Sequence, residues 1–197
     1  GSGKSAQVPQ MILDADLAAG KRIIVLEPRR VAARTLAARV ASERKGKLGG
    51  EIGYRIRFDD VSSRETRVSF VTEGVLLRQL QDDPTLVNVG AVVFDEFHER
   101  NLMSDVALAM VKQLQATRRP DLKLAVMSAT LDAEPVGVYL GAKVLTAEGS
   151  MYPVSVFHTD LHDDRRPAEK AAAVVAQIVN SDDPGDILVF MPGRGEI

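Results

Sequence analysis

The chain has 197 residues, of which 45% are hydrophobic and 26% are charged, and this globular composition supports a sizeable core. Its formal net charge is -2 at pH 7, which excludes a global positive field, so any contact with nucleic acid must come from local patches. The chain has no cysteine, which excludes disulfides and thiolate zinc sites, and no apolar run nears the ~18 residues of a membrane span, so we expect a cytoplasmic protein without a membrane partner.

The first part of the chain alternates short apolar runs with longer helical patterns. Residues 22–26 form an apolar run typical of a buried strand, whereas residues 51–58 alternate apolar and polar side chains, as a half-exposed strand does. We expect Gly20 to follow the first helix directly, and Ser104 to cap a later one. Strands are predicted at residues 22–26, 51–58, 67–71, 91–94 and 122–127, and helices at residues 6–19, 30–44, 74–81 and 104–115.

The pattern changes near residue 147, where glycine, serine and proline indicate a linker. The residues that follow are too few to complete a domain. We therefore expect a first domain at residues 1–147, and at residues 148–197 a linker and the incomplete beginning of a second α/β unit. The elements predicted there are strands at residues 154–157 and 186–191 and a helix at residues 167–180 that begins with Pro167.

Strands that alternate with helices predict a parallel α/β sheet with helices on both faces. In such sheets, ligands bind at the carboxyl ends of the strands. The polar residues that directly follow the predicted strands are therefore the candidates for function, because scattered surface residues would not share this placement. These groups are residues 27–30, 72–74, 95–98 and 128–130.

The first five residues end like a Walker A loop, GxxxxGK[ST], whose first glycine would lie before Gly1. In such a loop the backbone of Gly1, Ser2 and Gly3 turns its N–H groups toward phosphate oxygens at the start of a helix. Lys4 would reach the β- and γ-phosphates of ATP, and Ser5 would bind Mg2+. The alternative is an ordinary flexible Gly/Ser loop.

Two carboxylates, Asp95 and Glu96, follow the apolar run 91–94, which is the Walker B arrangement. Asp95 would bind Mg2+, usually through water, and Glu96 would orient and deprotonate the attacking water. The alternative is a solvated acidic turn, which also commonly follows a strand. The P-loop candidate upstream and the strand–helix alternation between the two disfavour that alternative.

A third group, Ser128, Ala129 and Thr130, follows the last predicted strand of the first domain. Taken alone, a Ser-x-Thr turn is more often a helix cap. The tripeptide becomes informative through the order of the three motifs, because helicases have GKS first, DEFH second and SAT third.

With these motifs, the chain resembles the DEAH-box superfamily 2 helicases, and most closely their bacterial HrpB-type branch. The resemblance is collinear and covers essentially the whole chain. Phe97 stands where the family name has alanine, and the DEFHER form is similar to that of the HrpB branch. The motifs are GSGKS (1–5), LEPRRVAAR (26–34), GYRIRF (53–58), VTEGVLLRQL (71–80), DEFHER (95–100), MSATLD (127–132) and ILVFMPGRGEI (187–197).

The resemblance implies a P-loop NTPase with two RecA-like domains and ATP between them, the second beginning within residues 148–197. It implies an ATP-dependent RNA helicase core that couples hydrolysis of ATP, or another NTP, with Mg2+ to 3′ to 5′ translocation and duplex unwinding. DNA is the alternative nucleic-acid substrate. The alternative is a catalytically weak module that binds NTP and RNA as a scaffold, which the intact Walker residues disfavour. A P-loop transporter ATPase would need a signature of its own and would not explain DEFHER followed by SAT.

The resemblance also assigns nucleic-acid contacts. Arg29 and Arg30 match residues that lie along the nucleic-acid backbone, and a planar guanidinium suits phosphate. An ordinary surface pair at the start of a helix is an equally good interpretation of these two arginines. Thr72, Glu73 and Gly74 match the family's next strand-contacting loop, where a hydroxyl and a backbone N–H can donate to phosphate.

In the family, the residue matching His98 links the nucleotide site to the Ser-Ala-Thr loop at residues 128–130, and so couples hydrolysis to domain movement. The family's arginine finger lies beyond the motifs present, so the resemblance implies that this chain alone binds nucleotide weakly and hydrolyses it poorly. Outside the motifs, we expect Arg118 and Arg119 to be solvated loop charges.

Overall fold

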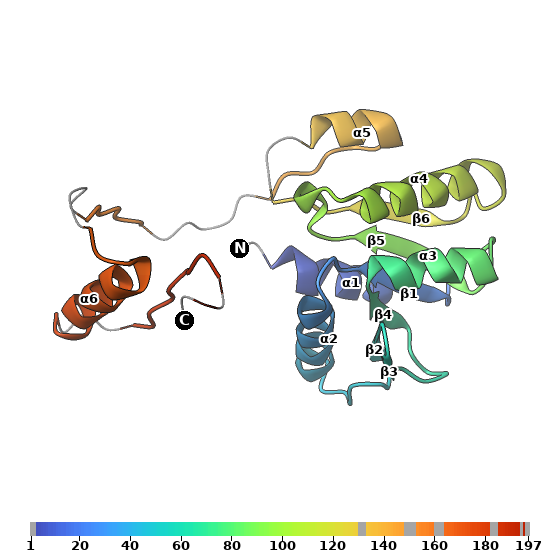
Figure 1. The fold of residues 1–197 in the computed structure, drawn as a ribbon. Helices are drawn as coiled ribbons and strands as arrows, with labels where there is room; N and C mark the ends of the chain where they lie inside the picture. Colours follow the sequence, from blue (N-terminus) through green and yellow to red (C-terminus); the bar gives the residue numbers. More distant parts are fainter. Residues whose placement is uncertain are drawn as a thin grey trace. The chain divides into compact units, whose positions relative to one another are not determined.

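The computed structural model describes residues 3–129, 133–147, 153–159, 164–181, 185–193 and 195. The chain divides into two compact units, Gly1–Ser150 and Met151–Ile197. Every strand and helix predicted before residue 130 is present in the first unit, although several bounds differ. The elements of this unit (Figure 1) are α1 (Lys4–Asp14), β1 (Arg22–Leu26), α2 (Arg30–Glu43), β2 (Ile52–Ile56), β3 (Asp59–Val61), β4 (Val68–Val71), α3 (Glu73–Asp82), β5 (Val89–Phe94), η1 (Phe97–Glu99), α4 (Leu102–Thr117), β6 (Lys123–Val126) and α5 (Glu134–Leu140).

The first unit is built on a six-stranded sheet in the order β3-β2-β4-β1-β5-β6. Only β3 is antiparallel to its neighbour, and the other pairs are parallel. The central strand β1 ends in register with both neighbours, because Leu26 pairs with Val71 of β4 and with Phe94 of β5. The carboxyl ends of these strands therefore meet at one edge of the sheet.

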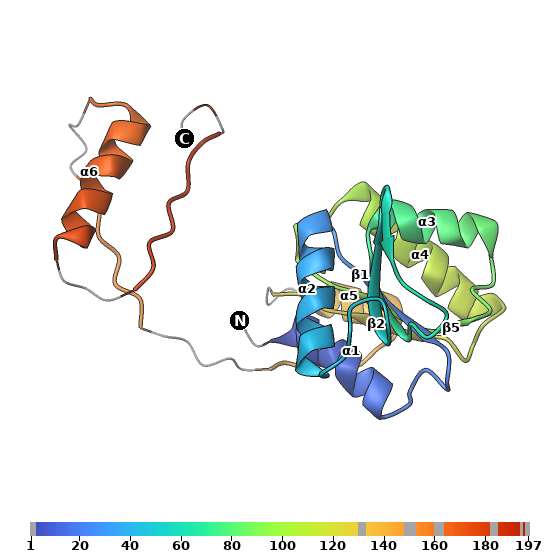
Figure 2. The same ribbon diagram turned by 90° about the horizontal axis from the view of Figure 1, so that it is seen from below.

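Helices cover both faces of this sheet, as predicted from the alternation of strands and helices (Figure 2). Successive side chains of a strand point to opposite faces, so Ile23 and Val25 of β1 pack with α1 and α2, whereas Ile24 and Leu26 pack with α3 and α4. Because both faces are covered, every residue of β5 is buried. This double burial explains why the central strands are continuous apolar runs.

The first helix ends earlier than predicted, at Asp14 instead of residue 19. Asp16, Ala19 and Gly20 have positive φ angles of 46°, 49° and 72°, so the chain after the helix turns repeatedly. The Oδ1 atom of Asp16 accepts a hydrogen bond of 2.9 Å from the backbone N–H of Gly20. The prediction that Gly20 directly follows the helix was wrong, because a side chain–backbone turn competes with the last helical turn.

The start of α4 also differs from the prediction, which placed Ser104 at the N-cap. The helix begins at Leu102, and Asn101 is its N-cap. The Oδ1 atom of Asn101 accepts a hydrogen bond of 2.9 Å from the backbone N–H of Ser104. Asparagine and serine are equally good caps, so the choice between them depends on where the preceding chain leaves η1.

The strand predicted at residues 51–58 ends at Ile56 in the structure, as β2, and a two-residue turn at Arg57 and Phe58 follows it. The turn joins β2 to the antiparallel β3, which was not predicted. Phe58 has a φ of 68°, a left-handed conformation that is uncommon for a bulky residue, and its side chain is 90% exposed. The period-two pattern continues through the turn, which is why it conceals the turn.

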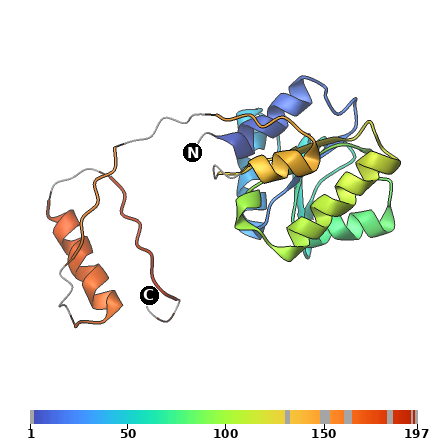
Figure 3. The same cartoon turned by 90° about the horizontal axis from the view of Figure 1, so that it is seen from above.

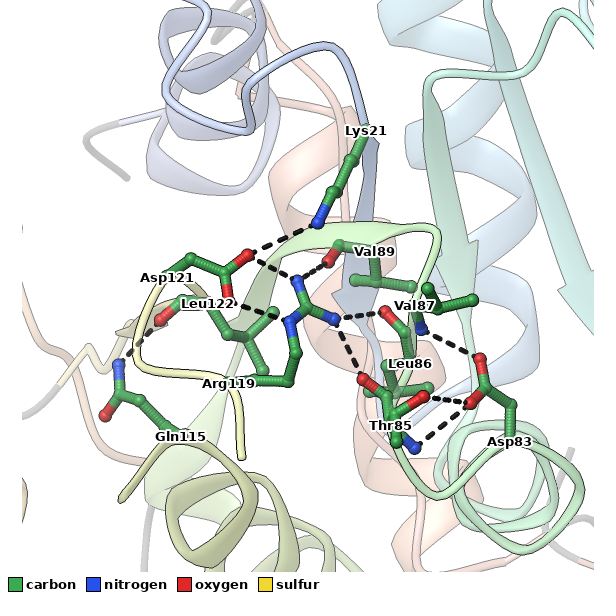
Figure 4. Close-up of polar contacts among 10 residues, drawn as sticks. All are labelled: Lys21, Asp83, Thr85, Leu86, Val87, Val89, Gln115, Arg119, Asp121 and Leu122. Carbon is green, nitrogen blue, oxygen red and sulfur yellow. Dashed lines mark hydrogen bonds and ion pairs between the residues drawn. The ribbon is translucent and has the colours of Figure 1, made fainter. Parts of the chain in front are cut away.

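Arg119 is buried at the amino edge of the sheet, contrary to the prediction of a solvated charge (Figure 4). Its guanidinium donates two hydrogen bonds to the carboxylate of Asp121, at 2.8 Å and 2.7 Å. It also donates to the backbone carbonyls of Thr85, Leu86 and Val89 at 2.6–2.8 Å. The side chain thus ties the loop before β6 to the loop before β5.

The second unit contains α6 (Pro167–Val179), which begins at Pro167 as predicted. Figure 3 shows chain without regular structure both before and after this helix in sequence. The strands predicted at residues 154–157 and 186–191 are absent from the described parts of those segments, where Phe157 and Phe190 are exposed. A strand exists only when it pairs with a neighbour, and apolar content alone does not supply one. No helix in the described residues is long and apolar enough to cross a membrane.

Candidate nucleotide-hydrolysis site

The polar residues predicted to share a site do lie at one edge of the sheet. The backbone hydrogen bonds continue past the strand ends there: the Asp95 N–H donates to the Leu26 carbonyl at 3.0 Å, and the Glu27 N–H donates to the Val71 carbonyl at 2.8 Å. The Phe97 N–H donates to the Met127 carbonyl at 3.1 Å. Parallel pairing thus fixes the residues after β1, β4, β5 and β6 side by side.

The described part of the P-loop forms the start of α1. Gly3 is the N-cap, with a left-handed φ of 71°, and Lys4 is the first residue of the helix. The first turn carries no acidic residue, so the N-terminal N–H groups and Lys4 together favour an anion. Gly1 and Ser2 lie outside the described residues.

Asp95 is buried at the end of β5 and is 5% exposed. Its Oδ1 atom accepts a hydrogen bond of 2.8 Å from the backbone N–H of Glu96. Its Oδ2 atom is buried and has no hydrogen-bond partner in the described part of the chain. A buried carboxylate oxygen without a partner fits the preference of Mg2+ for anionic oxygen, so Ser5 and Asp95 are a suitable donor set for that ion.

Glu27, which belongs to the candidate group at residues 27–30 but had no predicted role, lies next to Asp95 at the end of β1. It is 1% exposed, and its Oε1 atom has no hydrogen-bond partner among the described residues. Burial, followed by the charge of Asp95 and a hydrogen bond with it, raises the pKa of Glu27 to about 9. The sequence held a signal for this residue, because Glu27 follows a buried apolar strand as Asp95 does.

Glu96 and His98 lie in the turn that follows β5. Glu96 has a left-handed φ of 48°, a conformation that is uncommon for residues other than glycine. The Oε2 atom of Glu96 lies 3.4 Å from Nε2 of His98. The Nδ1 atom of His98 accepts a hydrogen bond of 3.3 Å from the backbone N–H of Ala129, which assigns the imidazole proton to Nε2.

His98 therefore contacts both the candidate base and the loop after β6. The predicted coupling between hydrolysis and the Ser-Ala-Thr loop depends on these two contacts of His98. Ser128 and Ala129 follow β6 after one intervening residue, Met127, and Thr130 lies outside the described residues. The side chain of His98 alone therefore connects Glu96 to the backbone of Ala129.

The arginines predicted to contact nucleic acid lie at the start of α2. Arg29 is its N-cap residue and Arg30 its first residue, and both are exposed. The guanidinium of Arg29 forms an ion pair of 2.6 Å with the carboxylate of Glu99 in η1. Arg29 is thus held over the turn that carries Glu96, and any phosphate that binds it must compete with Glu99.

The second predicted nucleic-acid loop lies at the start of α3, next to the arginines. Thr72 is the N-cap residue, and the site of Gly74 faces open space. The Oε1 atom of Glu73 accepts hydrogen bonds from Asn101 at 3.0 Å and from Ser104 at 3.2 Å. The structure thus engages Glu73 with the start of α4, which leaves Thr72 and Gly74 as the donors of this loop.

Phe97, the departure from the DEAH pattern, has a packing role. It is 6% exposed, and its ring meets that of Phe94 edge-to-face, with 6.3 Å between the ring centroids. The guanidinium of Arg100 lies over its other side, 5.3 Å from the ring centroid. The phenyl ring closes the apolar layer beneath the turn and touches none of the candidate catalytic groups in these contacts.

Comparison with known proteins agrees with this geometry. The DEAD/DEAH box helicase family model matches residues 1–137. The chain is 41% identical over 209 aligned positions to the Probable ATP-dependent RNA helicase DHX35 homolog of Caenorhabditis elegans, covering 100% of this chain and 28% of that protein. It is also similar to two crystal structures of Escherichia coli HrpB, one described as a DEAH/RHA helicase and the other as a DExH-box NTPase.

Both structures are 41% identical to this chain and cover 98% of it, with TM-scores of 0.87 and 0.78. The chain spans 25% and 24% of those two chains. These similarities confirm the predicted RecA-like fold and the predicted resemblance to the HrpB branch. The chain itself corresponds to about a quarter of each relative.

Proposed function

The chain belongs to the DEAD/DEAH box helicase family, and we propose that it forms the nucleotide-binding lobe of an ATP-dependent RNA helicase. The observation that carries this proposal is the buried carboxylate of Asp95 at the carboxyl end of β5, whose Oδ2 atom has no hydrogen-bond partner among the described residues. The proposed class of activity is taken from the names of the relatives, and the residues proposed to carry it are taken from the site. We place the first RecA-like domain at residues 1–147 and the beginning of the second at residues 148–197.

In the proposed reaction, each side chain at the edge has a distinct task. The P-loop backbone and Lys4 bind the β- and γ-phosphates of ATP, while Ser5 and Asp95 hold Mg2+, which neutralises phosphate charge when bound. Glu96 orients the attacking water and accepts its proton. His98 positions Glu96 through the 3.4 Å contact and conveys its state to Ala129.

The proposed nucleic-acid path lies along the same edge, on the side of β4. Arg29 and Arg30 bind backbone phosphates, and Thr72 and Gly74 donate to the next phosphate. Contacts of this kind read no base edges, so the proposed substrate is RNA of any sequence, moved in the 3′ to 5′ direction. Closure of the two RecA-like domains on ATP, and their reopening after hydrolysis, would move these loops along the strand.

ATPase activity, measured in a protein that carries both RecA-like domains, tests this proposal. RNA and DNA oligonucleotides of matched length are added in parallel, together with a reaction that contains neither. The helicase proposal expects turnover stimulated by RNA and lost in Glu96→Gln. Hydrolysis stimulated by neither nucleic acid would instead favour a scaffold that binds NTP and RNA without unwinding.

A further inference from the structure

We propose that Glu27 is a second acidic determinant of divalent-metal affinity beside Asp95, and that it acts on the ion through the ion's water shell. This inference rests on the proposed nucleotide site and names a residue that the Walker motifs do not contain. Its basis is the position, burial and surroundings of the two carboxyl groups.

The two carboxyl groups lie side by side because their strands do. Glu27 follows Leu26 and Asp95 follows Phe94, and Leu26 and Phe94 are partners in the parallel pairing of β1 with β5. Glu27 is 1% exposed and Asp95 is 5% exposed. Each has one buried oxygen without a hydrogen-bond partner in the described residues, Oε1 of Glu27 and Oδ2 of Asp95.

The charged groups around this pair make it unusual. Within residues 3–129, no lysine, arginine or histidine forms an ion pair with either carboxylate. The other charged groups that act on Glu27 are acidic, Glu96 and Glu99, and Arg29 pairs with Glu99. A buried acidic pair with no cationic side chain beside it fits a site that receives a cation, because buried carboxylate charge needs a positive partner.

A bound divalent cation would supply the positive charge that no described side chain supplies to this pair. Mg2+ keeps several waters when it binds to proteins, and those waters need carboxylate acceptors. A second carboxylate one strand away from Asp95 supplies such an acceptor, and its buried setting strengthens the attraction. Residues that surround a metal's direct ligands commonly change metal affinity by 10–100-fold.

The test uses Mn2+ as the probe, because its binding is measured directly by electron paramagnetic resonance. Mn2+ affinity is measured with ADP present in a protein that carries both RecA-like domains, for the wild-type chain, Glu27→Gln and Glu27→Asp. ADP affinity is measured in parallel with the metal removed by EDTA. Glu51→Gln is the matched control, because it also replaces a glutamate with an amide but lies at the opposite edge, in an ion pair with Arg44.

The expected result is Mn2+ affinity weaker by about 10–100-fold in Glu27→Gln, with ADP affinity in EDTA unchanged. Glu27→Asp retains the charge and should recover part of the loss, and Glu51→Gln should match the wild-type chain. Equal Mn2+ affinity in Glu27→Gln and the wild-type chain would overturn this inference alone. An equal loss of ADP affinity with and without metal would also overturn it, by showing a structural role. Failure of the wild-type chain to bind Mn2+ with ADP would overturn the proposed nucleotide site as well.

Discussion

Arg29 and Glu99 form an ion pair of 2.6 Å that joins the start of α2 to the turn after β5. The pair connects two motifs that lie far apart in the sequence, one proposed to bind nucleic acid and the other to hydrolyse nucleotide. The side chain of Arg29 is 72% exposed, so a phosphate can reach it. Glu99 is then both an anchor for the arginine and a competitor for the same guanidinium.

Glu99→Gln should strengthen the binding of single-stranded RNA by about two- to five-fold. An exposed ion pair is weak, so the affinity gained by releasing Arg29 from Glu99 is modest. Fluorescence anisotropy at fixed salt concentration measures the affinity. Asp82→Asn is the control, because it releases Arg78 from an exposed pair on α3. Weaker binding in Glu99→Gln would show that Glu99 chiefly orients Arg29.

Glu96→Gln should lower the turnover of ATP by at least about 100-fold in a protein with both RecA-like domains. The amide can still orient a water molecule but cannot accept its proton, so nucleotide affinity should stay close to that of the wild-type protein. Lys4→Ala is the contrasting variant, because it should abolish nucleotide binding itself. Steady-state ATPase and fluorescent ADP titration separate the two effects. Normal hydrolysis by Glu96→Gln would remove Glu96 from the role of base.

Glu27 should make the metal-free protein less stable as the pH rises. Its folded pKa, about 9, lies above the ordinary value of 4.5, so the folded state binds a proton that the unfolded state releases. The stability from this group is complete below pH 4.5 and is lost as the pH approaches 9. Glu27→Gln lacks this dependence, so its stability relative to wild type should increase with pH, by up to about 1.4 kcal/mol per pH unit. Urea unfolding in EDTA at several pH values measures the difference, and parallel curves would contradict it.

Arg119→Met should lower the free energy of unfolding by about 2–4 kcal/mol, because it leaves buried carbonyls without donors. Arg119→Lys should be nearly as harmful, since a single ammonium cannot replace a planar fork that reaches Asp121 and the carbonyls of Thr85, Leu86 and Val89. Urea denaturation measures both variants. The exposed neighbour provides the control, and Arg118→Met should change stability little. Full stability of Arg119→Lys would contradict the proposed importance of the fork.

Phe58→Gly should be more stable than Phe58→Ala by about 1 kcal/mol. Both variants remove the exposed ring and its contact with Arg57, but only glycine adopts the φ of 68° without steric cost. Thermal or urea unfolding of the two variants isolates the backbone effect at this turn. Equal stability would show that the turn relaxes to another conformation when the ring is removed.

The sequence by itself determined the parallel strands of the first unit and the order of the motifs. A strand that is covered on both faces needs consecutive apolar residues, and the sequences of β1 and β5 show such runs. Asp95 and Glu96 were identified because they follow such a run and because the P-loop candidate upstream disfavours an ordinary acidic turn. Their chemical roles remain predictions that the variants above test.

Only the tertiary structure decided which strand lies beside which, and therefore which side chains meet. Glu27 and Asp95 are far apart in the chain, and they became neighbours because β1 lies between β4 and β5 in the sheet. Arg119 was predicted to be solvated, and this prediction was wrong. The side chain donates to backbone carbonyls at residues 85, 86 and 89, and no local sequence pattern indicates such contacts. Burial and pairing are properties of the assembled sheet, and a charged residue's environment is set by segments that the neighbouring sequence does not specify.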